Sequence, residues 1–349
     1  MSTTSGVTWD LSAFADQIAQ AKAGRERLLR ESAALKANLP VKYFRQMAHF
    51  TTPASEFGMA DKAASQGFAA APRILSRFNI TPQDLASRIG IDPGAIDRVL
   101  AGDTHSPLVM IDGEDAQALR DDVVQRGREN AIKLFTESDW GSTLRFYRPS
   151  GLNLEYGVED LFTVLTQVAR GRRPEEYPID GIVYPKVEHP SELEWVCDIL
   201  AQVERAIGLE ENRIRLEFLV ESGWALVNLP ELTRRCVHRL AGIIFGIADY
   251  SADLLLPEIY NDHPVADIAR AIIVNVAGAA EVPAIDNMTV NYPVADRSLS
   301  DDQNRARILD RLEEVFRDAI HGLKLGMDGK WVGHPLQLFM VMLAYESYL

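Results

Sequence analysis

The stretches RLEFLVE (residues 215–221) and GIIFGIAD (residues 242–249) share one pattern, a short apolar run that ends at a carboxylate. Apolar runs of this length that alternate with helical segments are typical of buried parallel strands. In an α/β barrel the active site lies at the carboxyl ends of the strands. Glu221 and Asp249 are therefore predicted to share a site, and two carboxylates with no basic neighbour in sequence indicate a hard divalent cation.

Six further segments follow the same alternation of strand and helix along the chain. Eight parallel strands with helical crossovers predict a closed (β/α)8 TIM barrel of the α/β class. Length does not require a second domain, because single barrels of about 250 residues or more are common, so we treat 1–349 as one barrel domain. The predicted strands are 43–50, 107–111, 143–147, 181–184, 215–220, 242–247, 282–285 and 329–332.

Two segments lie outside the eight predicted units. Residues 9–38 form an amphipathic N-terminal helical extension, and residues 72–104 form a small helical insertion between units 1 and 2. Within the insertion, Thr81 and two short predicted helices, 83–89 and 93–100, have the spacing of a helix-turn-helix. Its four arginines and four aspartates cancel in charge, whereas DNA recognition needs a basic surface. We favour an insertion that covers a barrel end or an oligomer interface.

Composition limits the classes of partner. The chain has 349 residues, 47% hydrophobic and 25% charged, and a formal net charge of −14. This acidity argues against binding to nucleic acid or to anionic membranes. No apolar stretch is long enough for a membrane helix, and the first residues lack the features of a signal peptide, so we expect a cytoplasmic protein. Cys197 and Cys236 form no metal-binding pattern and are predicted to be reduced core thiols.

Ionisable side chains recur at the same end of the other predicted strands. An arginine beside a metal suits a 2-oxo acid, because the guanidinium can clamp the carboxylate through two hydrogen bonds. The metal would act as a Lewis acid on the neighbouring carbonyl, and the chemistry would be the making or breaking of a carbon–carbon bond. The candidates are Asp112, Glu114, Asp115, Arg145, Lys186, Glu221, Asp249, Asp286 and His334.

The order of these motifs resembles the citrate lyase beta-subunit-like family, within the HpcH/HpaI aldolases and malyl-CoA lyases. The resemblance covers about residues 107–340. The segments that carry it are MIDGEDA (110–116), LRFYRP (144–149), GIVYPKVEHPSEL (181–193), LEFLVESGWALVNLPEL (216–232), GIIFGIADYSADL (242–254), VPAIDN (282–287) and LGMDGKWVGHPLQL (325–338).

The resemblance implies a role for each matched residue. Glu221 and Asp249 become the Mg²⁺ ligands, and Arg145 becomes the clamp for the substrate carboxylate. Glu114 and Asp115 become the acidic pair that holds Arg145 and a metal-bound water. Supporting positions around them are Asp112, Lys186, Asp286 and His334, although Asp286 is equally suited to capping the next loop and His334 to ordering its own loop.

The resemblance also implies a reaction and an assembly. The reaction is a reversible aldol or Claisen-type cleavage of a hydroxy-acid or its CoA thioester, which yields a 2-oxo acid such as oxaloacetate or glyoxylate. The family tends toward trimers or hexamers, so we expect a homo-oligomer.

One departure from the family pattern leaves alternatives open. The first-strand segment HFTTPAS (49–55) lacks the arginine and glycine that approach the CoA phosphates in the family. A CoA-independent aldolase acting on pyruvate or oxaloacetate is therefore the first alternative. The second is a regulator that senses a ligand in the barrel and binds DNA through the insertion, for which salt-sensitive binding to a duplex would be the evidence.

Overall fold

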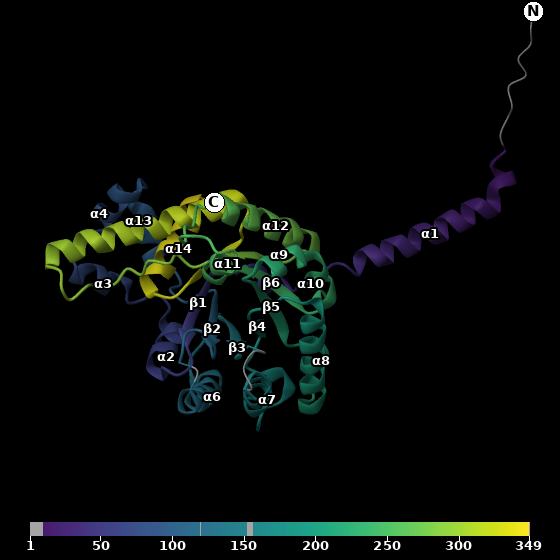
Figure 1. The fold of residues 1–349 in the computed structure, drawn as a ribbon, viewed down its shortest axis with the longest axis horizontal. Coiled ribbons are helices and arrows are strands. Elements are labelled where there is room, and N and C mark those ends of the chain that lie inside the picture. The colour runs from purple at the N-terminus through teal and green to yellow at the C-terminus, as the bar shows by residue number, and fades with distance from the viewer. Residues whose placement is uncertain (1–9, 119, 152–155, 349) are drawn as a thin grey trace, which may run out of the picture.

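A computed structural model describes residues 10–118, 120–151 and 156–348 of the chain. Eight parallel strands form a closed barrel in which each strand pairs with its neighbours in chain order (Figure 1). The predicted (β/α)8 fold is confirmed. The strands are β1 Ala48–Pro53, β2 Leu108–Asp112, β3 Leu144–Arg148, β4 Gly181–Tyr184, β5 Arg215–Val220, β6 Leu240–Phe245, β7 Ala284–Asp286 and β8 Gly329–Val332.

Helices surround this barrel, and one further helix projects away from it (Figure 1). Among the helices of the described residues, none combines the length and the apolar character that a membrane span requires. The helices are α1 Ala15–Ala33, α2 Phe57–Gln66, α3 Ala71–Arg77, α4 Pro82–Ile89, α5 Pro93–Ala101, α6 Asp121–Glu137, α7 Gly157–Gln167, α8 Pro190–Ile207, α9 Gly223–Val227, α10 Leu229–Cys236, α11 Ile247–Asp253, α12 Pro264–Ala280, α13 Asp301–Leu325 and α14 Pro335–Tyr348.

The first strand differs most from its prediction. Residues Val41–Phe44 form a short 3-10 helix after Pro40, and the strand begins only at Ala48. The predicted turn at 51–53 belongs to the strand instead, and Pro53 still lies opposite Asp112 of β2. Two β-branched threonines favour extended backbone there, and a proline at a strand end removes little from the ladder. The remaining strands match their predicted ranges or are shifted by one or two residues.

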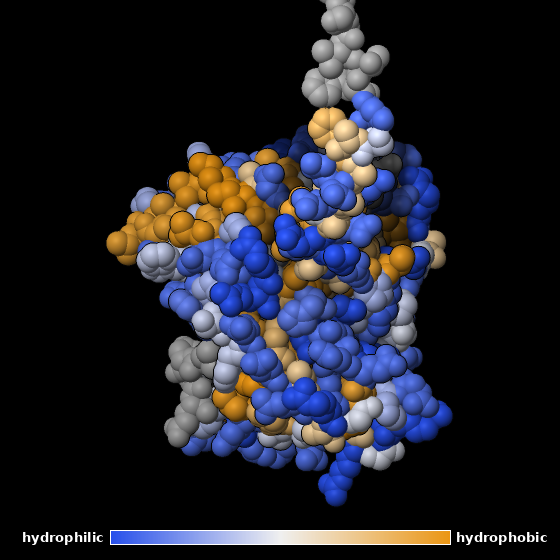
Figure 2. All heavy atoms as spheres, turned by 90° about the vertical axis from the view of Figure 1, so that its right-hand side faces the viewer, coloured by the Kyte–Doolittle hydropathy of each residue, from blue (hydrophilic) through white to orange (hydrophobic). Residues whose placement is uncertain are grey.

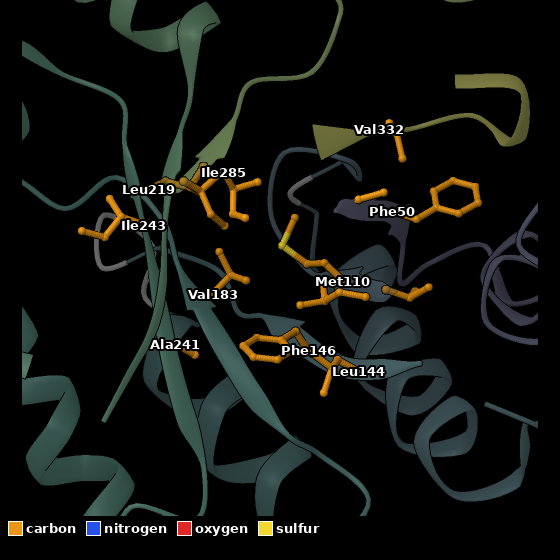
Figure 3. Close-up of a cluster of buried hydrophobic side chains, with 14 of the residues drawn as sticks. Phe50, Met110, Leu144, Phe146, Val183, Leu219, Ala241, Ile243, Ile285 and Val332 are labelled. Carbon is orange, nitrogen blue, oxygen red and sulfur yellow. The ribbon is translucent and has the colours of Figure 1, made fainter. Parts of the chain in front are cut away.

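Alternate strand residues fill the inside of the barrel (Figure 3). Met110, Phe146 and Leu219 come from three strands, point into the barrel and are buried in one cluster, whereas Phe50 and Ile243 are buried on its outer face. Because side chains alternate between the two faces of a strand, a residue two positions further along points to the same side. Asp112, Arg148 and Glu221 follow Met110, Phe146 and Leu219 by two positions, so this alternation brings them to the interior rim at the carboxyl end.

Three buried polar side chains, Gln46, His49 and Glu217, lie together inside the barrel. Gln46 donates a hydrogen bond to the carbonyl of Ala241 and lies 2.7 Å from His49 Nε2. His49 Nδ1 faces Glu217 Oε2 at 3.6 Å, and neither atom has a hydrogen-bond partner in the described part of the chain. Burial lowers the pKa of His49 to about 3 and raises the pKa of Glu217 to about 8. Both side chains are therefore neutral at pH 7.

This neutral Glu217 predicts how stability depends on pH. A carboxyl group whose pKa is raised on folding holds a proton that the unfolded chain has lost, so it lowers stability as pH rises toward 8. Glu217→Gln keeps the shape and removes the titration. We expect the free energy of unfolding of the variant to rise relative to that of the parent as pH increases. By pH 7 this relative gain should reach about 3 kcal/mol, since each pKa unit is worth about 1.4 kcal/mol. Urea unfolding at pH 5, 6, 7 and 8 measures the difference, and a pH-independent difference would contradict it.

The segment 72–104 packs against the last two helices of the chain. Helix α4 contacts α13 and α5 contacts α14. Arg88 donates to Asp310 at 2.7 Å, and Arg98 donates to Glu346 at 2.9 Å. These two arginines are therefore engaged within the chain, which leaves the helix-turn-helix-like pair without the basic surface that DNA recognition needs.

Candidate active site

A cavity of about 810 Å³ lies at the carboxyl end of the barrel. Apolar groups from α2 and from the turn before α3, including Met59 and Ala70, form part of its wall. Such a largely apolar cavity with a few convergent polar groups is typical of a small-molecule site. The residues that end a strand or directly follow one, and that line the cavity, are Pro53, Asp112, Arg148, Glu221, Gly246, Asn287 and Gly333.

Arg148 is the cation at the bottom of this site. It donates to both carboxylate oxygens of Asp112, at 2.7 and 2.5 Å, and lies 3.3 Å from Glu114 Oε2. Its guanidinium carbon lies 5.3 Å from the centre of the Trp331 ring. The Nη1 atom is buried and has no hydrogen-bond partner among the described residues. This geometry leaves a guanidinium donor available to an anionic ligand in the cavity.

Arg145, which was predicted to clamp the substrate, does not lie with this group. Its side chain hydrogen-bonds to the carbonyl of Pro178 and lies over the ring of Trp140, and it does not line the cavity. The reason is the alternation of side chains along β3. Phe146 points into the barrel, Arg145 points to the opposite face, and Arg148 returns to the interior.

Four carboxylates converge on the ammonium group of Lys186. The distances from its Nζ are 3.3 Å to Glu114, 2.9 Å to Asp115, 3.2 Å to Asp249 and 4.0 Å to Glu221. Glu114 and Asp115 lie in the loop after β2, Glu221 directly follows β5, and Asp249 lies in the first turn of α11 after β6. The structure therefore brings together five of the predicted candidates around one centre of positive charge.

The protonation of these acids follows from burial and from the two cations. Burial raises the pKa of Glu221 to about 8 and that of Glu114 to about 7, although Arg148 and Lys186 oppose the shift. Burial also acts to raise the pKa of Asp115, but the hydrogen bond from Lys186 and the charge of Arg148 outweigh it and lower this pKa. The cluster therefore contains carboxyl groups whose pKa values are shifted by burial and by neighbouring charges, as is common at functional sites.

The donor set suits the Mg²⁺ that the family resemblance implies. Glu221 Oε2 and Glu114 Oε2 are buried and have no hydrogen-bond partner within the described part of the chain, and carboxylates beside open solvent are what this ion prefers. No three His, Cys, Asp or Glu side chains of the described residues already surround a metal position. The ammonium of Lys186 lies among these acids and supplies their counter-charge.

Backbone features fix the positions of these groups. A Cβ atom on Gly246 would lie 2.5 Å from Glu221 Cγ, so only glycine leaves room for this carboxylate. Gly113 donates from its backbone N–H to the carbonyl of Arg148 at 2.8 Å, which holds the loop after β2 against β3. Lys186 has a positive φ of 49°, an uncommon conformation for a residue with a side chain and one that is enriched at functional sites.

Two of the supporting candidates, His334 and Asp286, lie in different places, and His334 alone of the two lines the cavity. His334 lines the cavity, and its Nδ1 accepts a hydrogen bond from the backbone of Leu336. Burial lowers its pKa to about 4, so the neutral ring carries its proton on Nε2. Asp286 does not line the cavity; it is buried between Arg270 at 2.7 Å and Lys330 at 3.2 Å.

Two basic residues near the cavity were not among the candidates from the sequence. Lys62 in α2 and Arg73 in α3 are exposed and line the cavity. Neither makes an ion pair with another residue of the described chain. Their only signal in the sequence is their presence on the helices that follow β1, where the family motif is altered.

Comparison with known proteins identifies the family of the chain. The family model described as HpcH/HpaI aldolase/citrate lyase matches residues 104–335. The chain belongs to this family. The matched range runs from just before β2 to the start of α14, so it includes every carboxylate around Lys186 as well as Arg148.

Curated relatives are distant. A glyoxysomal malate synthase from Candida tropicalis is 23% identical over 244 residues, which is 65% of this chain and 42% of that protein. An L-malyl-CoA/beta-methylmalyl-CoA lyase from Haloarcula marismortui is 26% identical over 50% of this chain and 48% of its own length. The corresponding lyase from Rhodobacter capsulatus is 27% identical over 69% of this chain and 71% of its own. The matches thus span less than half of the first two relatives.

Solved structures share the fold. RipC from Yersinia pestis matches with a TM-score of 0.54 and 19% identity, over 86% of this chain and 95% of that chain. The malate synthase of Haloferax volcanii, in a pyruvate/acetyl-CoA ternary complex, matches with a TM-score of 0.57 and 18% identity, over 85% of this chain and 68% of that chain. At these identities the likeness concerns the fold alone.

Proposed function

We propose that this protein is a Mg²⁺-dependent carbon–carbon lyase that cleaves or forms a bond beside the carbonyl of a 2-oxo acid. The observation that carries the proposal is the convergence of Glu114, Asp115, Glu221 and Asp249 on one cation beside a buried arginine. Family membership supports the reaction class. A lone ion pair or a structural salt bridge would not need four acids, three of which (Asp115, Glu221 and Asp249) line the cavity.

The chain's own residues have distinct tasks in this proposal. Glu221 and Asp249 hold Mg²⁺, which supplies Lewis-acid polarisation of a carbonyl when bound. Arg148 replaces Arg145 as the anion-binding arginine, because its buried Nη1, which lies 3.3 Å from Glu114 Oε2, has no hydrogen-bond partner in the described chain. Asp112 fixes the plane of that guanidinium through two hydrogen bonds. His334 offers an N–H to the same cavity, and the apolar wall excludes water from the reacting carbonyl.

In the condensing direction, the second substrate beside the 2-oxo acid is an acyl-CoA thioester rather than a free carboxylic acid. Lys62 and Arg73 line the cavity as exposed cations without an ion pair in the described residues, and phosphates bind to such groups. They lie on the helices after β1, where the family's arginine and glycine are missing from HFTTPAS. The curated lyases named for malyl-CoA support the same class of substrate.

Calorimetric titration tests the proposed function. The Mg²⁺-loaded protein is titrated with oxaloacetate, glyoxylate and pyruvate, then with acetyl-CoA, and the series is repeated with EDTA. We expect metal-dependent binding of one 2-oxo acid, followed by binding of the thioester. Binding of the acid alone would favour the CoA-independent aldolase, and no binding of either would overturn the proposal.

The two exposed cations give a separate prediction about the thioester. Replacing Lys62 and Arg73 by alanine removes two positive charges near the phosphates, so we expect the KM for the CoA thioester to rise about tenfold or more, as two exposed charge-assisted contacts of roughly 1 kcal/mol each allow. The KM for the 2-oxo acid should stay unchanged. Initial rates with each substrate varied in turn measure both, and Lys133→Ala, on the outer helix α6, is the control.

A further inference from the structure

Helix α1 buries none of its side chains against the described part of its own chain. It extends away from the barrel in Figure 1, and none of its 19 residues, all within the described chain, is buried. Leu28 and Leu29 are 61% and 51% exposed, and Ile18 lies on the same side of the helix as Leu29, eleven residues or about three turns away. An isolated helix of this length is marginal in water. We call Leu11–Ala33 the arm, and it needs a surface that covers its apolar side.

A matching surface lies beside the candidate active site. Exposed apolar side chains gather at the upper left of Figure 2. Helix α9 packs against α12, and the backbone N–H of Gly223 at the start of α9 donates to Asp253 at the end of α11. These three helices therefore form one surface, which we call the apolar face. Its exposed apolar residues are Trp224, Val227, Leu254, Leu255, Ile268 and Ile272.

The two surfaces are complementary in charge as well as in hydrophobicity. Residues 22–30 of the arm, KAGRERLLR, carry four basic residues and one acidic residue. Residues 240–269, which contain α11 and the start of α12, carry no lysine or arginine, and three of their acidic residues make no ion pair in the described chain: Asp253, Glu258 and Asp262. Opposite potentials steer two surfaces together and suppress wrong partners.

We propose that the arm of one copy of this chain docks on the apolar face of a second copy. The base of the arm explains why the partner is another copy. Ala37 donates to the carbonyl of Ala280, and Lys36 pairs with Glu281 at 3.0 Å, so the arm leaves the barrel at the far end of α12 from the apolar face. The arm then points outward. Exchange of an identical element between two copies buries both surfaces twice.

The mass of the full chain in solution tests the proposal without any use of activity. Sedimentation equilibrium compares the parent with an arm variant, Leu28→Asp with Leu29→Asp, and a face variant, Val227→Asp with Leu255→Asp. We expect an oligomer for the parent and a smaller species for each variant. The control is Val158→Asp on α7, an exposed apolar position outside both surfaces, which should keep the parent mass.

A second experiment identifies the contact as one between copies. Both native cysteines are buried, so single cysteines at Leu28 in one batch and at Val227 in another react alone. A short bifunctional maleimide should link the two only in the mixture, as a species of twice the chain mass. The proposal would be overturned by a monomeric parent, or by an arm or face variant that keeps the parent mass. It would also be overturned if the arm variant alone dissociated, or if the mixed cross-linked species did not form.

Discussion

Glu221→Gln and Asp249→Asn should each lower the turnover by at least about a hundredfold, because the Lewis acid held by these oxygens supplies several kcal/mol of transition-state stabilisation. Each variant replaces a charged ligand by an amide of the same shape. Calorimetry with Mg²⁺ should show the loss of binding directly. The fold should persist, since burial already disfavours the charged form of Glu221 by raising its pKa to about 8.

Lys186→Met is the matched variant with the opposite expected result. It removes the ammonium that lies within 4.0 Å of all four acids, so these carboxylates lose their internal counter-ion. Mg²⁺ should then bind more tightly than to the parent. If the methionine variant binds the ion more weakly, or if Glu221→Gln retains full turnover, the assignment of the carboxylates as metal ligands fails.

The architecture and most of the acidic cluster could be predicted from the sequence because both depend on local patterns. Apolar runs of strand length between helices determine the barrel, and residues directly after a strand must lie at its carboxyl end. Glu114, Asp115, Glu221 and Asp249 meet around Lys186 for this reason alone. The length of each loop then had little influence on which acids meet.

The remaining parts depend on side-chain direction and on contacts between distant segments. The alternation along β3 was available in the sequence, and it would have selected Arg148 over Arg145 because Leu144 and Phe146 share its parity. The sequence placed Lys186 at the same end of the barrel as the acids, but it did not indicate the positive φ of this residue. Lys62 and Arg73 reach the cavity only because the helices after β1 pack over its rim.

Arg148→Met should cost stability as well as activity. The substitution leaves Asp112 fully buried without the guanidinium that binds both of its oxygens, and breaking one side of such a buried pair typically costs about 3–5 kcal/mol. Two backbone N–H groups, those of Glu114 and Ala116, still donate to Asp112, so the lower end of that range is expected. Urea denaturation of parent and variant measures the loss.

The double variant Arg148→Met with Asp112→Asn separates the structural effect from the functional one. Removing both charges abolishes the uncompensated carboxylate, and most of the lost stability should return, since apolar or neutral replacements of a whole buried pair are often nearly neutral. Binding of a 2-oxo acid should not return, because no donor then replaces Arg148 Nη1. Recovery of ligand binding along with stability would mean that Arg148 acts only as the partner of Asp112, and the anion-binding role would fall to His334 or Lys186.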